Sequence, residues 1–104
     1  MSSIHLIERV KHMHSIDKLN NIWESGDWVI AKQTAQELIG GNIYFQSAQD
    51  APSYFGGEIT NFRVIPDDAA ESPGRIVFMF KPSIKHKNIR SGITGWGNEK
   101  NIVR

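Results

Sequence analysis

The chain has 104 residues, no cysteine and a formal net charge of +1. A chain of this length is expected to form one domain, residues 1–104, which buries roughly 60 to 70% of the surface that its unfolded form exposes. The lack of cysteine excludes a disulfide scaffold, a cysteine-based zinc site and thiol catalysis. No apolar run approaches the ~20 residues of a membrane-spanning helix. We therefore expect a cytoplasmic protein without membrane contact.

The N-terminal half predicts two helices and one short strand. Residues 4–10 fit both a strand and a helical stripe, and the pattern does not decide between them. Ser15 is a suitable N-cap for a helix that ends at Ser25-Gly26, because one face of this helix would be apolar. The apolar residues of this face are Ile16, Leu19, Ile22 and Trp23. A strand is expected at 27–31 and a second helix at 33–39, before two glycines.

The C-terminal half predicts three strands. Residues 42–47 form the first of these, and 58–65 form the next, in which irregular alternation suggests a bulge. A polar loop follows at 66–74, with turn residues at both ends. Residues 75–80 are the most hydrophobic run and are expected in the middle of the sheet. This order predicts an α+β fold: a small, mostly antiparallel, partly closed β-barrel with two or three short helices.

Four short segments resemble the PUA-like superfamily, in particular its EVE and ASCH groups. The EVE pattern opens with a strand of the type YWLF and continues with GD-x-V-L-F-Y-x-S, a loop containing proline, and G-I. The matching segments are Asp27-Trp28-Val29-Ile30, Gly41–Ser47, Pro52 and Gly57-Glu58-Ile59. The resemblance covers about residues 27–80, and the chain lacks the long insert of EVE domains. It implies a small barrel that binds nucleic acid, often through a modified base in an aromatic pocket. Some ASCH-like proteins instead hydrolyse modified nucleosides.

A ligand pocket is predicted from aromatic and polar residues on the expected strands and in one loop. Trp28 offers a face on which a base could stack. Gln46 carries a donor and an acceptor, which is the chemistry that reads a base edge. Tyr54 and Phe55 stand beside two glycines, which would let a ligand approach the backbone. The predicted ligand-binding residues are Trp28, Tyr44, Gln46, Ser47, Tyr54 and Phe55. Each of them also has an ordinary interpretation as a core or surface residue.

The C-terminal segment 81–104 is basic, with six lysines and arginines against one acid. Such a segment could neutralise the phosphates of a nucleic acid, and Trp96 could stack on a base or sugar. The predicted phosphate-binding residues are Lys81, Lys85, Lys87, Arg90 and Trp96. A solvated basic tail is the alternative.

Metal and catalytic signals are weak. His12 and His14 are two residues apart, without a third ligand at a metal-binding spacing, so we expect no metal and no cofactor. Lys32 and Glu37, with Thr34 between them, could form the catalytic group of an ASCH-type hydrolase. They are five positions apart and share a helical face poorly, so a pair of surface side chains is the simpler interpretation.

Three functions follow from these features, and we expect a binding module rather than an enzyme. The first is binding of nucleic acid or a nucleotide, including one with a modified base. The second is binding of a protein partner, for example as an inhibitor of a bacterial nuclease or defence system carried by a mobile element. In that case Tyr54 and Phe55 would be the anchors. The third is a small nucleoside amidohydrolase that uses Lys32 and Glu37. The sequence leaves the oligomeric state open.

Overall fold

A single curled β-sheet dominates the structure. The computed structural model describes residues 2–9, 11–91, 96–97 and 100–103. Within them the strands lie in the order β2-β3-β6-β5-β4-β1-β8-β7. Their bounds are β1 Ser3–Ile7, β2 His14–Asp17, β3 Ile22–Trp28, β4 Asn42–Gln46, β5 Ser53–Val64, β6 Ile76–Pro82, β7 Trp96–Gly97 and β8 Lys100–Val103. The helical elements are α1, Lys32–Leu38, and the short 3-10 turn η1, Ile84–His86.

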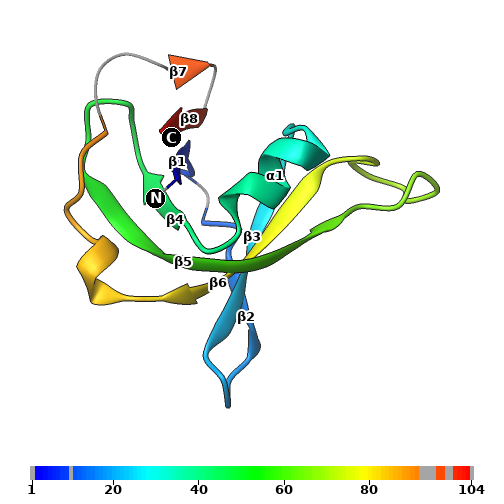
Figure 1. Ribbon diagram of the computed structural model, residues 1–104, viewed down its shortest axis with the longest axis horizontal. Helices are drawn as coiled ribbons and strands as arrows, with labels where there is room; N and C mark the ends of the chain where they lie inside the picture. Colours follow the sequence, from blue (N-terminus) through cyan, green and yellow to red (C-terminus); the bar gives the residue numbers. More distant parts are fainter. Residues whose placement is uncertain (1, 10, 92–95, 98–99, 104) are drawn as a thin grey trace.

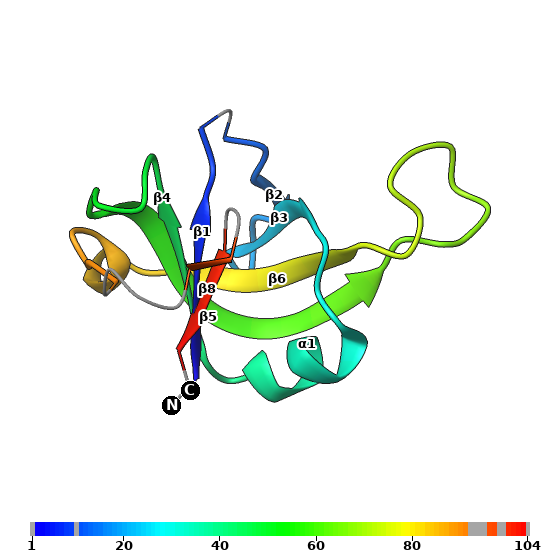
Figure 2. The same cartoon turned by 90° about the horizontal axis from the view of Figure 1, so that it is seen from above.

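The sheet bends into a trough, and α1 lies in its open side (Figures 1 and 2). β1 pairs with β4 in parallel and with β8 in antiparallel orientation, while the other strand pairs of the described chain are antiparallel. The long strands β5 and β6 form the floor of the trough, and β1 and β8 rise on one side of it (Figure 1). The curvature therefore turns one face of the sheet inward, where it can be buried without a second sheet.

The core fills this trough. In β1 and β4 alternate side chains point inward, namely Ile4, Leu6, Ile43 and Phe45, and all four are fully buried. The helix α1 adds Ala35 and Leu38 from above. Phe45, Phe55 and Phe80 pack with ring centroids 5.4 to 6.1 Å apart, a separation typical of favourable aromatic pairs.

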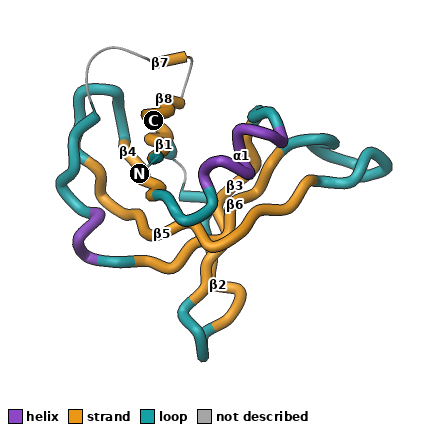
Figure 3. Tube along the Cα trace, viewed as in Figure 1, coloured by secondary structure: helices purple, strands orange, loops and turns teal. Residues whose placement is uncertain are grey.

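The expected fold class is wrong. The described part of the chain is mostly β, with one α-helix, and the trough is not closed into a barrel. Figure 3 shows how much of the trace is strand. No helix in the residues that the structure describes is long and apolar enough to cross a membrane.

The predicted helix beginning at Ser15 is in fact the hairpin of β2 and β3. The Asp17 carboxylate accepts hydrogen bonds from the backbone N–H and the side-chain amide of Asn20, at 3.1 and 2.8 Å, which closes the turn. Asn21 follows with a φ of 55°, a conformation that asparagine tolerates better than most residues. Leu19, expected on a buried face, is 93% exposed at the tip of the hairpin. Local turn chemistry thus overrides the apolar spacing.

Other sequence expectations agree with the structure. The helix at 33–39 is α1, and the strands at 42–47 and 75–80 are β4 and β6. The bulge expected in 58–65 appears as a register shift between Ile59 and Asn61. The strand that contains this bulge starts earlier than expected, at Ser53, so Tyr54 and Phe55 belong to β5 and not to a loop.

Gly56 and Gly57 are required by the close approach of another part of the chain. A Cβ at Gly57 would lie 2.1 Å from the carbonyl oxygen of Lys81, and one at Gly56 would lie 2.3 Å from that of Ile43. These glycines therefore let strands approach each other, rather than a ligand.

We expect Gly57→Ala to lower the free energy of unfolding by about 3 kcal/mol, because the backbone of β6 must move to make room for the added methyl group. Denaturant unfolding followed by circular dichroism measures this change. Gly97→Ala is the matched control, since a Cβ at Gly97 meets nothing within 4 Å. Equal stability of the two variants would contradict the packing described.

Candidate functional site

A cleft marks the place where the curled sheet fails to close. It lies between the ends of β1 and β8 on one side and the end of β3 on the other, and its volume is about 540 Å³. The lining residues include Glu8, Arg9 and His12 near the end of β1, Gly26–Val29 around the end of β3, and Ser72, Arg75 and Lys100. We call this cavity the seam cleft.

The seam cleft is lined by more basic than acidic side chains. Arg9, Arg75 and Lys100 face the two acids Glu8 and Asp27. Arg75 donates a hydrogen bond to Asp27 at 3.2 Å. The pKa of Asp27 is held below its usual range, chiefly by a hydrogen bond from the Ser72 side chain and also by Arg75. Asp27 is therefore ionised at neutral pH and keeps Arg75 at the cleft.

Arg9 is positioned by a second contact. Its Nε donates to the carbonyl oxygen of Ser47 at 3.0 Å. This bond connects the segment that follows β1 to the residue directly after β4. Both arginines of the cleft are thus restrained by named partners, which lowers the entropy that they would lose on binding an anion.

Trp28 supplies the aromatic surface of the cleft. Its half-buried ring packs against the core cluster and lines the cavity. Its indole nitrogen is buried and has no hydrogen-bond partner among the described atoms. Gly26 lets the side chains of His12 and Glu8 approach the backbone of β3. A Cβ at this position would lie 3.2 Å from the Cβ of His12 and 3.5 Å from Oε2 of Glu8.

A second cavity, of about 310 Å³, is mainly apolar. Its lining residues are Lys11, Met13, Trp23, Tyr54 and Phe55, and we call it the aromatic pocket. The rings of Trp23 and Phe55 meet edge to face, with centroids 5.3 Å apart. The Lys11 ammonium lies 5.2 Å from the centroid of the Tyr54 ring, within the range of a cation–π contact.

The Tyr54 hydroxyl connects the two cavities. It donates to the backbone carbonyl of Glu8 at 2.5 Å. Burial, with a smaller effect of the Glu8 charge, raises the pKa of Tyr54 to about 12. Tyr54 is therefore neutral at physiological pH and acts as a fixed donor between β5 and the chain that leaves β1.

The predicted ligand-binding residues are separated by this structure. Trp28 lies in the seam cleft, whereas Tyr54 and Phe55 line the aromatic pocket. Tyr44 lies on the outer face of β4, between two histidine rings. Its ring stacks on that of His5, with centroids 4.6 Å apart, and is tilted against that of His86, with centroids 5.2 Å apart. Tyr44 does not line either cavity.

Gln46 is fully buried and uses its amide within the protein. Its Oε1 lies 2.7 Å from Nδ1 of His5, and its Nε2 donates to the carbonyl of Ala51 at 2.7 Å. The side chain thereby fixes the turn after β4 and is not accessible to a base edge. The neighbouring Ser47 is exposed and contributes its carbonyl to Arg9.

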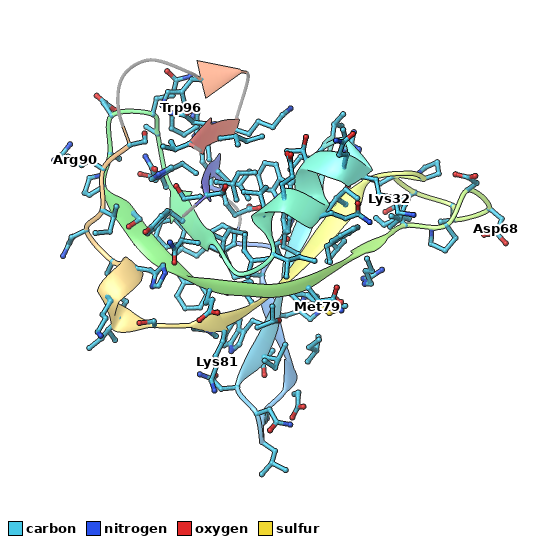
Figure 4. The ribbon with its side chains drawn as sticks, in the orientation of Figure 1. Lys32, Asp68, Met79, Lys81, Arg90 and Trp96 are labelled. Carbon is cyan, nitrogen blue, oxygen red and sulfur yellow. The ribbon has the colours of Figure 1, made fainter. Side chains whose placement is uncertain are left out.

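The predicted phosphate-binding residues lie outside both cavities. Lys81, Lys85 and Lys87 are exposed, and Arg90 donates to the carbonyl of Asp50 at 2.6 Å. In Figure 4 the labelled Arg90 and Trp96 lie in the upper left part of the molecule, whereas Lys81 lies below the sheet. Among the described cations of the basic C-terminal segment, Lys100 lines the seam cleft.

The weak catalytic candidates do not form a site in the described chain. Lys32 and Glu37 are both exposed on α1, and neither lines the seam cleft or the aromatic pocket. The described residues contain no group of three or more histidines and acids that could hold a metal ion.

Sequence reasoning missed most of the charged residues of the seam cleft. The pairing of β1 with β8 brings Arg9 and Lys100 together, and the curvature of the sheet brings Arg75 to them. No local spacing relates them. The nearest signal was the position of Arg75 directly after the Pro73-Gly74 turn, where a strand begins.

Comparisons of the chain with protein-family models, with curated proteins and with solved structures found no match. The resemblance to the PUA-like superfamily therefore stays a prediction.

We expect the protein to lose stability as the pH falls from about 7 to about 5.5, because burial lowers the pKa of His5 and of His86 below the unfolded value of 6.5. In this range the unfolded chain binds more protons than the folded one, so acid favours unfolding, whereas above pH 7 these histidines add no pH dependence. Denaturant unfolding at several pH values measures the slope. His5→Gln should reduce the slope. A flat profile in the native chain would contradict this expectation.

Proposed function

We propose that the protein binds a nucleotide, either free or as part of a nucleic acid, in the seam cleft. The observation that carries this proposal is the meeting of one aromatic ring, Trp28, with three cations in a single cavity of about 540 Å³. Pockets of ~300 to 1,000 Å³ are typical of small-molecule and cofactor sites. The cavity therefore has a suitable size for one nucleotide.

The side chains that line the cleft suit both parts of a nucleotide, its base and its phosphate. A base can stack on the Trp28 ring, which contributes ~1 to 3 kcal/mol whatever the base. Guanidinium groups bind phosphate oxygens in a two-pronged geometry, and an ammonium adds a point charge. Arg9, Arg75 and Lys100 supply these groups.

The backbone of β3 offers a way to recognise the base edge. In the described chain β2 pairs with β3 only as far as Glu24, while Asp27 and Trp28 pair on their other side with β6. One edge of this stretch therefore has no neighbouring strand where it adjoins the cleft. Peptide N–H and C=O groups can exchange hydrogen bonds with a base, which would replace the role first assigned to Gln46.

We expect Lys100→Gln to weaken the binding of AMP or dTMP about fivefold, and to reduce the salt dependence by about one phosphate contact. Isothermal titration calorimetry at low and moderate salt measures both quantities.

Lys85→Gln is the matched control, because Lys85 is exposed on η1 and lies outside the cleft. Equal losses in the two variants would point to general attraction by the basic surface instead of the cleft. Absence of binding by the native protein at low salt would refute the proposal.

Exposed apolar tips favour a second function, the binding of a protein partner. Leu19 at the hairpin tip is 93% exposed, and Ile84 on η1 is 83% exposed. Tyr54 and Phe55 are half-buried in β5, so the anchors of a partner would be Leu19 and Ile84. Leu19→Asp should leave nucleotide affinity unchanged, because Leu19 does not line the cleft. A loss of nucleotide affinity in this variant, measured in the same titration, would show that the hairpin belongs to the nucleotide site.

A further inference from the structure

The seam cleft and the aromatic pocket lie on opposite sides of the same piece of chain. After β1, Arg9 and His12 line the seam cleft, whereas Lys11 and Met13 line the aromatic pocket. The Tyr54 ring belongs to the aromatic pocket, and its hydroxyl is bonded to the carbonyl of Glu8, whose own residue lines the cleft. The two cavities are therefore neighbours, separated by the segment of chain that connects β1 to β2.

The aromatic pocket has the apolar, ring-rich lining of a base-stacking site. Its volume of about 310 Å³ is smaller than that of the seam cleft. Trp23, Phe55 and Tyr54 provide ring surfaces, and Met13 adds a polarisable thioether. Lys11 stands at the Tyr54 face, where an ammonium could meet the phosphate of a nucleotide whose base enters the pocket. Among the residues that the structure describes, no acid lines the pocket, although the Glu8 charge acts on Tyr54.

The charges around the two cavities favour one orientation of an anionic ligand. The loop 66–74, which contributes Ser72 to the seam cleft, also carries Asp67, Asp68 and Glu71, all of them exposed. Figure 4 shows Asp68 at the far end of this loop, away from the body of the protein. Across the cleft from this loop, Arg9 and His12 line the cavity together with the acid Glu8, and Lys11 lies beyond them at the aromatic pocket. A chain of phosphates is therefore repelled at the loop and attracted towards the aromatic pocket.

We infer that the aromatic pocket binds a second base, so that the ligand is a single strand of at least two nucleotides. This inference rests on the proposed function. One base stacks on Trp28 in the seam cleft, the next enters the aromatic pocket beside Trp23, and the phosphate between them passes Lys11 and His12. Single strands suit this arrangement because both bases must be unpaired to reach the two cavities.

Nuclear magnetic resonance of the three indole N–H groups tests the inference directly. The signals are assigned with the single variants Trp23→Phe, Trp28→Phe and Trp96→Phe. Titration with dTMP or AMP should shift the Trp28 signal and leave the Trp23 signal in place. Titration with the dinucleotide pdTpdT or its adenine ribonucleotide equivalent should shift both signals and bind about tenfold more tightly, which corresponds to one added stacked base.

Lys11→Gln provides a second test that keeps every aromatic side chain of the pocket and removes the ammonium beside Tyr54. It should weaken dinucleotide binding about threefold and leave mononucleotide binding unchanged, because Lys11 lies outside the seam cleft. Lys18→Gln is the matched control, as Lys18 is exposed in the hairpin turn.

Each outcome separates this inference from the proposed function. If mononucleotides shift the Trp28 signal but dinucleotides neither bind more tightly nor shift the Trp23 signal, the aromatic pocket is not a second base site and the proposed function stands. If neither ligand binds, both are refuted. A duplex that binds as tightly as a single strand of equal length would also overturn the inference.

Discussion

The parallel register between β1 and β4 is the constraint on which the rest of the structure depends. It pairs Ile4 with Ile43 and Leu6 with Phe45, so that four fully buried side chains line the inner face. Because side chains alternate along a strand, a slip of one residue would turn the polar His5 into the core. The ladder continues beyond the apolar pairs, since the backbone N–H of Glu8 donates to the carbonyl of Gln46 at 2.8 Å. The register therefore also determines where Glu8 and Arg9 stand in the seam cleft.

The buried polar groups behind this register make the wall of the cleft rigid. Gln46 bonds to His5 on β1 and to the carbonyl of Ala51, and so joins β1 to the turn after β4. A buried amide that lost these partners would retain the full cost of its desolvation, about 1 to 3 kcal/mol. The same turn presents the Ser47 carbonyl to Arg9. Gln46 therefore influences the candidate site indirectly. It fixes the turn after β4, and this turn carries the Ser47 carbonyl that positions Arg9.

The sequence predicts the elements whose signals are local and misses what depends on curvature. α1, β4 and β6 are bounded by glycine, proline or turn residues and were found near their true positions. The hairpin was mistaken for a helix because Ile16, Leu19, Ile22 and Trp23 fall at helical spacing, while the hydrogen bonds of Asp17 to Asn20 that close its turn leave little trace in an apolar pattern. Trp28 was identified as a stacking candidate from its residue type. Lys100 could not be paired with Arg9, because the pairing of β8 with β1 leaves no signal in the local spacing. Its proximity to Arg75 requires the sheet to curl through four strand pairings, from β8 through β1, β4 and β5 to β6.

The bulge in β3 lies beside the seam cleft. Ser25 and Gly26 together face Phe78 of β6, and the Ser25 hydroxyl takes over the missing ladder contact by accepting from the Phe78 N–H at 3.0 Å and donating to the Gly26 carbonyl at 2.8 Å. A bulge increases the local twist of the sheet, and the pairing of β3 with β6 resumes beyond it at Asp27 and Trp28. Beyond it, Asp27 holds Arg75 and Trp28 packs beside the cleft. The groups that would bind a nucleotide are thus held in place by contacts that exist without a ligand, and such preorganisation reduces the ordering cost of binding.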